Sequence, residues 1–535
     1  MRTATRAMLI FTLFMVAGWG TTANSYEEKG HHSKPLGVSL NLAALQGNTE
    51  AIRQHIKAGS DLNEKDAYGS TPLIIATTFG KTDAAKALIE AGADLNARNN
   101  EGSTALHVAA FLCRTEIVKA LLDKGANKYL RNNAGDTVLE SVAAPFDDVK
   151  GIYDSLGKAL GPLGLKLDYE QIRTTRPKIA QMLRPRTEEL EAVVYKPLSR
   201  DDWKISTPAE QGLDPMLVAD LYLEASGLPT LFGLLVIKNG CLIAERYFNE
   251  GSVEQKARLQ SVTKSFTSAL VGIALEQGYL SSVDQKMIDF FPEVADKITD
   301  LRKKQITIRH LLQMRAGYPR EESHPDFWEG LLSGHYPPLI EAFPLVSDPG
   351  TRFHYSNLTS NWLGIIVDRA CETNLKAYAE EHLFSPLDVK AGEWGQDAEG
   401  HNNGCGDLHL TARDAAKFGL LYLNDGVYEG NQIVPADWVH DSLQTYSVNE
   451  AFVKKVGDFR DIGYGYQWWS ANAGQHHVNF AWGHGGQLIV LVDEFDMVIV
   501  TTSYPFWLEH NDQSWKHEKA IIKLVGKFIN SLPKE

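Results

Sequence analysis

Cysteine is scarce in this chain, and long hydrophobic runs are missing from it. Four cysteines, Cys113, Cys241, Cys371 and Cys405, are spread over 535 residues and match no zinc-ligand spacing. So few cysteines in a chain of this length do not make a disulfide framework, and we expect buried free thiols. After the first 23 residues, no segment approaches the roughly 18 uninterrupted apolar residues of a membrane-spanning helix.

Positive charge is also in short supply. The chain holds 53 lysines and arginines against 67 acidic residues, a formal net charge of −14 at pH 7. Such an acidic balance argues against nucleic acid or an anionic membrane as a partner. Apolar residues at 44% and charged residues at 22% are typical of globular protein, and the length allows two or three domains.

Residues 1–23 predict a cleavable signal peptide. Arg2 and Arg6 make a basic start, residues 8–19 an apolar stretch, and Thr21-Thr22-Ala23 a small-residue cleavage site. No cysteine lies at that cleavage site, so we expect no lipid anchor. The mature protein is therefore expected to be periplasmic or secreted, with no membrane anchor.

A short sequence motif recurs every 33 residues in the N-terminal part. It is Gly-Ser-Thr-Pro-Leu from Gly69, Gly-Ser-Thr-Ala-Leu from Gly102 and Gly-Asp-Thr-Val-Leu from Gly135. The 33-residue period and the residues of the motif resemble ankyrin repeats, whose signature is T-P-L-H-x-A. The resemblance implies an all-α solenoid over residues 36–150, in which His107 is a structural hydrogen-bonding residue. Such a stack either binds an unidentified protein partner or serves as a platform that docks on the rest of the chain.

Ser261 and Lys264 lie one helical turn apart, at the start of an apolar helix predicted over residues 260–277. Residues i and i+3 share a helix face, so the lysine amine can reach the serine hydroxyl. A serine becomes a good nucleophile only when a neighbouring base accepts its proton, and a desolvated lysine can be that base. The plain alternative is a helix N-cap beside a solvated lysine.

Two further motifs follow along the chain. Tyr355-Ser356-Asn357 lies downstream, and His484-Gly485-Gly486 precedes a strongly apolar strand. In this order the three motifs resemble the serine β-lactamase and penicillin-binding-protein superfamily, which carries S-x-x-K, S-D-N and K-T-G. The Y-x-N and H-x-G variants are similar to its class C β-lactamase-related branch of esterases, amide hydrolases and D-amino-acid peptidases. The resemblance covers residues 201–535.

The resemblance implies a role for each motif. Ser261 attacks a carbonyl carbon and is acylated, and either Lys264 or Tyr355 is the general base. Lys264 in that role needs a pKa lowered by burial and by neighbouring positive charge. The expected substrate-binding residues are Asn357, His484, Gly485, Gly486 and Gln487.

The resemblance also implies how the oxyanion is held. We expect the backbone N–H groups of Ser261 and Gln487 to donate to it, the second from an edge strand. His484 stands where penicillin-recognising enzymes have lysine, and a histidine is mostly neutral near pH 7, which argues against efficient β-lactam hydrolysis. No metal and no other cofactor is expected.

The order of predicted elements indicates the fold class. Hairpins over residues 231–248 and 487–503, with a helical region between them and a final helix over 516–531, predict an α+β fold. As in the β-lactamase/transpeptidase fold, an antiparallel sheet would carry flanking helices and an inserted helical domain, preceded by the ankyrin solenoid. We expect residues 151–200 to be a linker of short helices and loops.

These observations predict an exported serine hydrolase that cleaves an ester or amide of a small molecule or peptide through an acyl-Ser261 intermediate. One alternative is a true β-lactamase or a D,D-peptidase. The other is an ankyrin-mediated binding protein or receptor, whose site is acylated but does not turn over.

Overall fold

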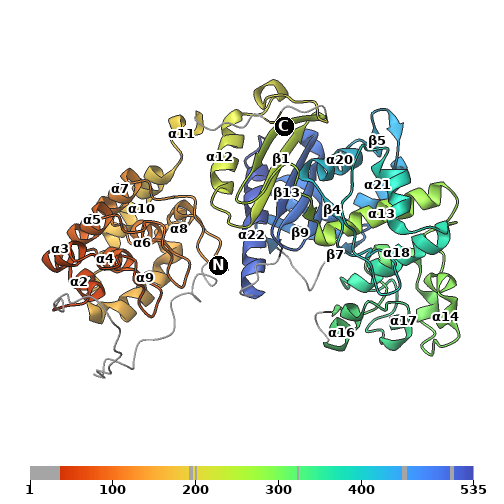
Figure 1. Cartoon of the computed structure of the whole chain (residues 1–535), viewed down its shortest axis with the longest axis horizontal. Helices are drawn as coiled ribbons and strands as arrows, with labels where there is room; N and C mark the ends of the chain where they lie inside the picture. The colour runs from red at the N-terminus through yellow and green to blue at the C-terminus, as the bar shows by residue number, and fades with distance from the viewer. Residues whose placement is uncertain are drawn as a thin grey trace. The chain divides into compact units, whose positions relative to one another are not determined.

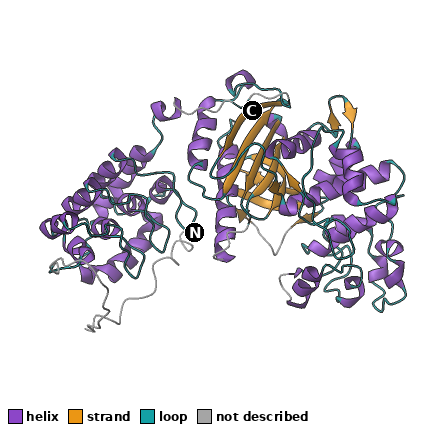
Figure 2. Cartoon of the chain, viewed as in Figure 1, coloured by secondary structure: helices purple, strands orange, loops and turns teal. Residues whose placement is uncertain are grey.

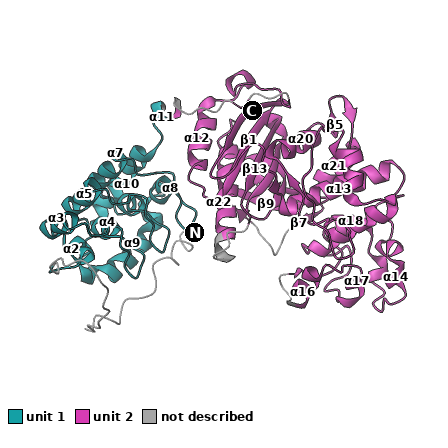
Figure 3. Cartoon of the chain, in the orientation of Figure 1, with its two compact units in different colours: residues 1–189 teal, residues 190–535 magenta. Residues whose placement is uncertain are grey.

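The computed structural model of the chain describes residues 37–191, 197–198, 202–321, 325–448, 455–505 and 511–533 (Figure 1). The predicted signal peptide, residues 1–23, lies outside the described residues. The chain divides into two compact units, residues 1–189 and 190–535 (Figure 3). Within the described ranges, no helix is both long and apolar enough to cross a membrane.

Paired short helices build unit 1, and the repeated motif explains where they begin. Thr71, Thr104 and Thr137 are the N-caps of α4, α6 and α8, and each hydroxyl accepts a hydrogen bond from the backbone N–H three residues on. This bond satisfies a helix-end donor that would otherwise be unpaired. The helices are α2 (Leu40–Gln46), α3 (Thr49–Lys57), α4 (Pro72–Thr78), α5 (Thr82–Glu90), α6 (Ala105–Phe111), α7 (Thr115–Asp123) and α8 (Val138–Ala143).

The segment predicted as a linker differs from the prediction. Two 15-residue helices, α9 (Phe146–Leu160) and α10 (Tyr169–Leu183), occupy half of it and share the hydrophobic core of unit 1. Buried Arg176 of α10 donates to the Tyr153 hydroxyl of α9 and to the Ala144 carbonyl. The last repeat has an apolar face that no further repeat covers, and these helices bury it.

A mostly antiparallel sheet organises unit 2 (Figure 2). Within the described residues it has nine strands in the order β2-β1-β13-β12-β11-β10-β9-β7, with β8 paired to β9. The strands are β1 (Leu231–Lys238), β2 (Cys241–Tyr247), β7 (Ser447–Val448), β8 (Lys455–Val456), β9 (Phe459–Tyr464), β10 (Trp469–Ala473), β11 (His476–Gly483), β12 (Gln487–Val492) and β13 (Met497–Ser503).

Both faces of this sheet are covered, because successive strand residues point to opposite sides. On β1, Leu234 and Val236 pack in the core with α12 (Pro215–Ala225) and α22 (Asn511–Asn530). Leu235 and Ile237 pack in the other core, with α13 (Thr263–Glu276), α18 (Asn357–Cys371) and α20 (Ala412–Leu423). The two terminal helices thus cover one face, and the helices from the middle of the chain cover the other (Figure 1).

The inserted region between β2 and β9 is mainly helical. It includes α14 (Pro292–Ala295), α15 (Ile308–Leu312), α16 (Pro325–Ser333), α17 (Leu339–Ala342), α19 (Leu375–Ala379) and α21 (Ala436–Leu443), together with the ribbons β3 (Ala257–Arg258)–β4 (His409–Leu410) and β5 (Val427–Tyr428)–β6 (Asn431–Gln432). The predicted α+β class, with an inserted helical domain and a helical repeat module before it, is confirmed.

All four cysteines are free. Cys113 and Cys241 are buried as predicted, whereas Cys371 and Cys405 are partly exposed.

Candidate active site

Ser261 lies in a single turn of 3-10 helix, η3 (Gln260–Val262), that leads directly into α13. Gln260 enters this turn with φ 52°, in the left-handed region that few non-glycine residues adopt. The turn lies tight against the end of β11, since a Cβ added at Gly483 would stand 2.2 Å from the Leu259 carbonyl oxygen. The nucleophile candidate is therefore held between a helix N-terminus and a strand end.

The strand that begins at Gln487 is not at the edge of the sheet, which corrects one prediction. β12 lies between β13 and β11, and β11, the strand beside Ser261, lies between β12 and β10. However, β10 pairs with β11 only as far as Phe480, so residues 481–483 extend beyond β10. The turn that carries Ser261 contacts this extension. Because β10 ends before β11 does, there is room for the site beside the end of β11, inside the sheet.

Lys264 connects three separate parts of the site. Its Nζ donates to Ser261 Oγ at 2.8 Å, to Asn357 Oδ1 at 2.8 Å and to the Cys405 carbonyl oxygen at 2.9 Å. An ammonium group has three protons and no acceptor, so these three acceptors match it. Lys264 is only 1% exposed, so its ammonium group is held away from solvent.

The charge of Lys264 differs from the prediction. Burial opposes the ammonium, but its neighbours Tyr355 and Cys405, followed by Glu321, outweigh burial and raise its pKa above the ordinary value. Tyr355, Cys405 and Glu321 all favour the cation, which is the opposite of the effect of the predicted positive neighbour. Lys264 is therefore held as an ammonium in the resting site.

Tyr355 and Asn357 flank the N-cap of α18. The Ser356 hydroxyl caps this helix by accepting from the Thr359 N–H, which fixes the backbone between the two side chains. The Tyr355 ring centroid lies 5.0 Å from Lys264 Nζ, and Tyr355 is foremost among the groups that raise the pKa of that lysine. The other face of Tyr355 belongs to an aromatic group, with its ring stacked on Trp469 at 5.5 Å.

His484 and the two glycines form the turn between β11 and β12, and a helix holds them in place. Glu518 of α22, only 2% exposed, lies with Oε2 2.8 Å from His484 Nδ1 and accepts from the Gly485 N–H at 2.8 Å. Its Oε1 accepts from the Trp482 indole N–H at 2.7 Å. Because of the hydrogen bond to Glu518, the pKa of His484 is raised, which favours the protonated imidazole more than the sequence predicts.

Gln487 contributes its backbone to this region and not its side chain. The side-chain amide is fully buried, donates to the Ser503 carbonyl and hydroxyl, and accepts from the Ser503 N–H. Its backbone begins β12, opposite Gly483. An expected oxyanion donor at Gln487 can therefore come only from the main chain.

Three residues of the site escape sequence reasoning. Cys405 supplies a carbonyl oxygen to Lys264, while Glu321 and Glu518 are buried carboxyls behind the second and third motifs. None of them belongs to the quoted motifs. The one available signal for Glu518 is its position on the apolar C-terminal helix, where an acid needs partners.

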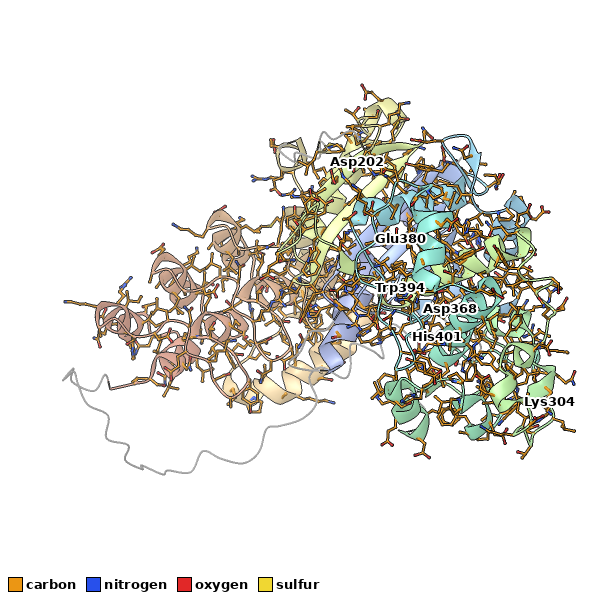
Figure 4. The ribbon with its side chains drawn as sticks, turned by 45° about the vertical axis from the view of Figure 1, so that its right-hand side comes forward. Asp202, Lys304, Asp368, Glu380, Trp394 and His401 are labelled. Carbon is orange, nitrogen blue, oxygen red and sulfur yellow. The ribbon has the colours of Figure 1, made fainter. Side chains whose placement is uncertain are left out.

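A charge pair supports the loop that carries Cys405. His401 Nδ1 lies 2.6 Å from Asp368 Oδ2 of α18, and the loop continues from His401 to Cys405 (Figure 4). The Cys405 N–H donates to Asn361 Oδ1, again on α18. The same helix thus carries Asn357 and fixes the loop whose carbonyl binds Lys264. Within the described ranges, no group of histidine, cysteine and acidic residues is arranged to hold a metal ion.

Comparison with known proteins identifies the larger unit. A family model described as Beta-lactamase matches residues 220–503, more than half of the chain. The chain belongs to the β-lactamase family. A second model, described as Ankyrin repeats (3 copies), matches residues 40–132. Both resemblances predicted from the motifs are confirmed, and the chain is a β-lactamase-family protein with ankyrin repeats.

Similar proteins in the β-lactamase family include hydrolases of several kinds. The chain is 25% identical to a 6-aminohexanoate-dimer hydrolase of Paenarthrobacter ureafaciens over 316 residues, 56% of this chain and 78% of that protein. It is 22% identical to Beta-lactamase-like protein 2 of Dictyostelium discoideum, covering 42% of this chain and 47% of the other.

Solved structures similar to this chain include a penicillin-binding protein homologue from Pyrococcus abyssi, at 20% identity and a TM-score of 0.45, covering 59% of this chain and 78% of that one. A D-stereospecific amidohydrolase from a Streptomyces species is 16% identical with a TM-score of 0.42, covering 55% and 94%.

Proposed function

We propose that this protein is an exported serine hydrolase that cleaves an ester or amide bond of a small molecule or peptide through an acyl-Ser261 intermediate. The observation that carries the proposal is the 2.8 Å hydrogen bond between Lys264 Nζ and Ser261 Oγ. It unites two motif residues within a β-lactamase-family domain. Export rests on the sequence of residues 1–23 alone.

Acylation begins with Ser261 oriented by Lys264. Because Lys264 is held as an ammonium, it donates to Ser261 Oγ and does not accept its proton. Tyr355 is the general base of this proposal, and its phenol oxygen takes the proton while Oγ attacks the substrate carbonyl carbon. The oxyanion receives hydrogen bonds from the Ser261 and Gln487 N–H groups, and each such donor typically contributes about 3 kcal/mol. When the tetrahedral intermediate collapses, the leaving group takes the proton from the Tyr355 phenol.

Deacylation repeats the sequence with water in place of Ser261. Tyr355 removes a proton from water as the oxygen attacks the acyl carbon, and then returns that proton to Ser261 Oγ as it leaves. The acid is released and the resting site is restored. Asn357 keeps Lys264 in position throughout, since its Oδ1 accepts from Nζ.

The relatives support an amide as one substrate class. A 6-aminohexanoate-dimer hydrolase is among the similar proteins, and its name indicates a substrate with an amide between two linear apolar segments. This dimer is therefore the first amide to test, beside a short-chain ester.

A second candidate is a β-lactamase or D,D-peptidase. It is favoured by the ion pair of His484 with the buried Glu518, which raises the pKa of His484. A protonated His484 keeps a positive charge where penicillin-recognising relatives have lysine, so a substrate carboxylate still has a partner.

The test is turnover by the full mature chain on a p-nitrophenyl ester, the 6-aminohexanoate dimer, a D-alanyl-D-alanine peptide and a β-lactam. Ser261→Ala is expected to reduce turnover more than a thousandfold, whereas Ser252→Ala, an exposed serine of the same unit, retains it. Turnover that survives Ser261→Ala would contradict the proposal. A single stoichiometric burst without turnover would instead support the acylated receptor.

A further inference from the structure

A buried glutamine outside the three motifs uses all of its polar atoms to join three helices. Gln467 lies in the turn between β9 and β10 and is 2% exposed. Its Oε1 accepts from the Ser360 hydroxyl of α18 at 2.7 Å, and its backbone oxygen accepts from the Ser265 hydroxyl of α13 at 2.8 Å. At the end of α15, its Nε2 donates to the Leu311 and Leu312 carbonyls at 3.1 Å and 3.0 Å. Its backbone N–H donates to the Leu312 carbonyl at 3.2 Å.

The backbone of Gln467 has a conformation that glutamine seldom adopts. Its φ is 63°, in the left-handed region. Such a conformation persists only where the surrounding interactions fix it, and it recurs at functional sites. Here five hydrogen bonds fix it, because they hold the backbone and the side chain together. A buried polar network in which every member is paired is also rigid, so the helices that it joins keep a defined spacing.

The two serines that bind Gln467 are neighbours of the first and second motifs. Ser265 follows Lys264 directly, and Ser360 lies one helical turn after Asn357. α13 and α18 lie side by side (Figure 1), and the 2.8 Å hydrogen bond from Lys264 Nζ to Asn357 Oδ1 crosses between them. The length of this bond depends on the spacing of the two helices, and Gln467 is bonded to both of them.

We propose that Gln467 holds α13 and α18 at the spacing at which Lys264 binds both Ser261 and Asn357. The inference deepens the proposed function and rests on the roles given there to these three residues. Gln467 acts through the two helices and is a positioning residue. Misplacing a reacting group by about 1 Å can cost on the order of a hundredfold in rate, so a partial loss of this spacing lowers kcat. None of the five hydrogen bonds reaches the β11–β12 turn that is proposed to bind substrate, so KM changes little.

Each connection of Gln467 can be removed with little change of shape. Ser265→Ala removes the bond to α13, and Ser360→Ala removes the bond to α18. Gln467→Met keeps a long side chain and removes the side-chain bonds to α18 and α15. Ser268→Ala is the matched control, since this serine of α13 is also fully buried but its hydroxyl has no hydrogen-bond partner in the described part of the chain.

The experiment is steady-state kinetics of the full mature chain on the p-nitrophenyl ester, with circular dichroism to verify folding. Ser265→Ala, Ser360→Ala and Gln467→Met are each expected to lower kcat about tenfold with little change in KM, and Ser268→Ala to retain the wild-type kcat. Because either serine variant already separates the two helices, the double variant of Ser265→Ala and Ser360→Ala is expected to lose about as much kcat as one of them. Two independent effects would instead multiply to about a hundredfold.

An unchanged kcat in the folded single variants, or a multiplied loss in the double variant, would overturn the inference. If Gln467→Met does not fold, the two serine variants decide. If the wild type shows no Ser261-dependent hydrolysis, the proposed function fails, and peptide-resolved hydrogen exchange decides the inference without turnover. Each serine variant is then expected to speed exchange in α13 and α18 together, while Ser268→Ala leaves both helices as in the wild type. Exchange that is unchanged in either helix would contradict the role of Gln467.

Discussion

The two units use histidine in opposite ways. Burial lowers the pKa of His107 in unit 1 to about 4, so its ring is neutral, and Nδ1 accepts from the Thr104 N–H of the same capping box. In unit 2, the hydrogen bond to Glu518 raises the pKa of His484. The capping partner of His107 lies three positions away, and its Nε2 lies 3.3 Å from the Asp136 carbonyl oxygen of the next repeat, whereas the partner of His484 comes from a distant helix. Local sequence therefore determines the repeat, whereas long-range packing determines the site.

Glycine shows the same contrast. Gly92 of unit 1 and Gly485 of unit 2 have nearly equal φ values, 86° and 87°. A Cβ added at Gly92 would meet nothing within 4 Å, whereas one at Gly485 would lie 2.5 Å from the Pro505 Cα. The repeat needs glycine only for its backbone conformation, while the site turn also needs its lack of a side chain.

The largest effect is expected at Lys264. Lys264→Met keeps the stem and removes the charge that binds Ser261, Asn357 and Cys405 together, so kcat/KM should fall about ten-thousandfold. Steady-state kinetics on the ester measures this, with circular dichroism to verify folding. Lys304→Met, in the inserted region (Figure 4), serves as the control and should retain activity. Equal losses in both variants would argue against a special role for Lys264.

Unit 1 should lose stability in acid through His107. Its folded pKa of about 4 lies below the ordinary 6.5, so the unfolded chain binds the proton more readily. Stability is therefore lost as pH falls from about 6.5 toward 4, by on the order of 3 kcal/mol, and no further below that. Peptide-resolved hydrogen exchange of α6 measures it. His107→Gln, which keeps a capping-box residue, should flatten this dependence; an unchanged slope would refute the assignment.

Gly92 and Gly485 have nearly the same φ, so alanine substitutions at these two positions test the contrast between the units. Gly92→Ala should cost about 1 kcal/mol, from the left-handed conformation alone. Gly485→Ala should cost about 3 kcal/mol, because the conformational penalty is joined by displacement of the Pro505 backbone. Hydrogen exchange in each unit reports the two changes separately, and equal costs would remove the distinction between the units.

These contrasts explain which parts of the fold and of the site could be predicted from the sequence. The hairpin strands β12 and β13 and the helix after Ser261 follow from residue patterns, and the repeated motif follows from its capping threonines. The α9–α10 pair was missed, because Gly161 and Pro162 suggest a break while the helices on either side are buried by tertiary packing. The raised pKa values of Lys264 and His484 were not predicted, because Tyr355, foremost among the groups that raise the pKa of Lys264, and Glu518, the partner of His484, are distant from them in sequence.

The smallest effect is expected at Glu518. Glu518→Gln removes the partner that raises the pKa of His484, so His484 should titrate at lower pH and be less charged at pH 7. If a substrate carboxylate binds His484, KM for an anionic substrate should rise about tenfold at pH 7, with little change for a neutral ester. The two substrates measured side by side provide the control. Equal changes in KM would mean that Glu518 only holds the Gly485 turn.

The measurement that tests the central claim most directly is the intact mass of the protein, mixed briefly with an acylating ester. The account predicts one added acyl group on the wild type, located by peptide mapping on Ser261 and absent from Ser261→Ala. Turnover without any adduct at Ser261, or an adduct at another residue that persists in Ser261→Ala, would contradict it.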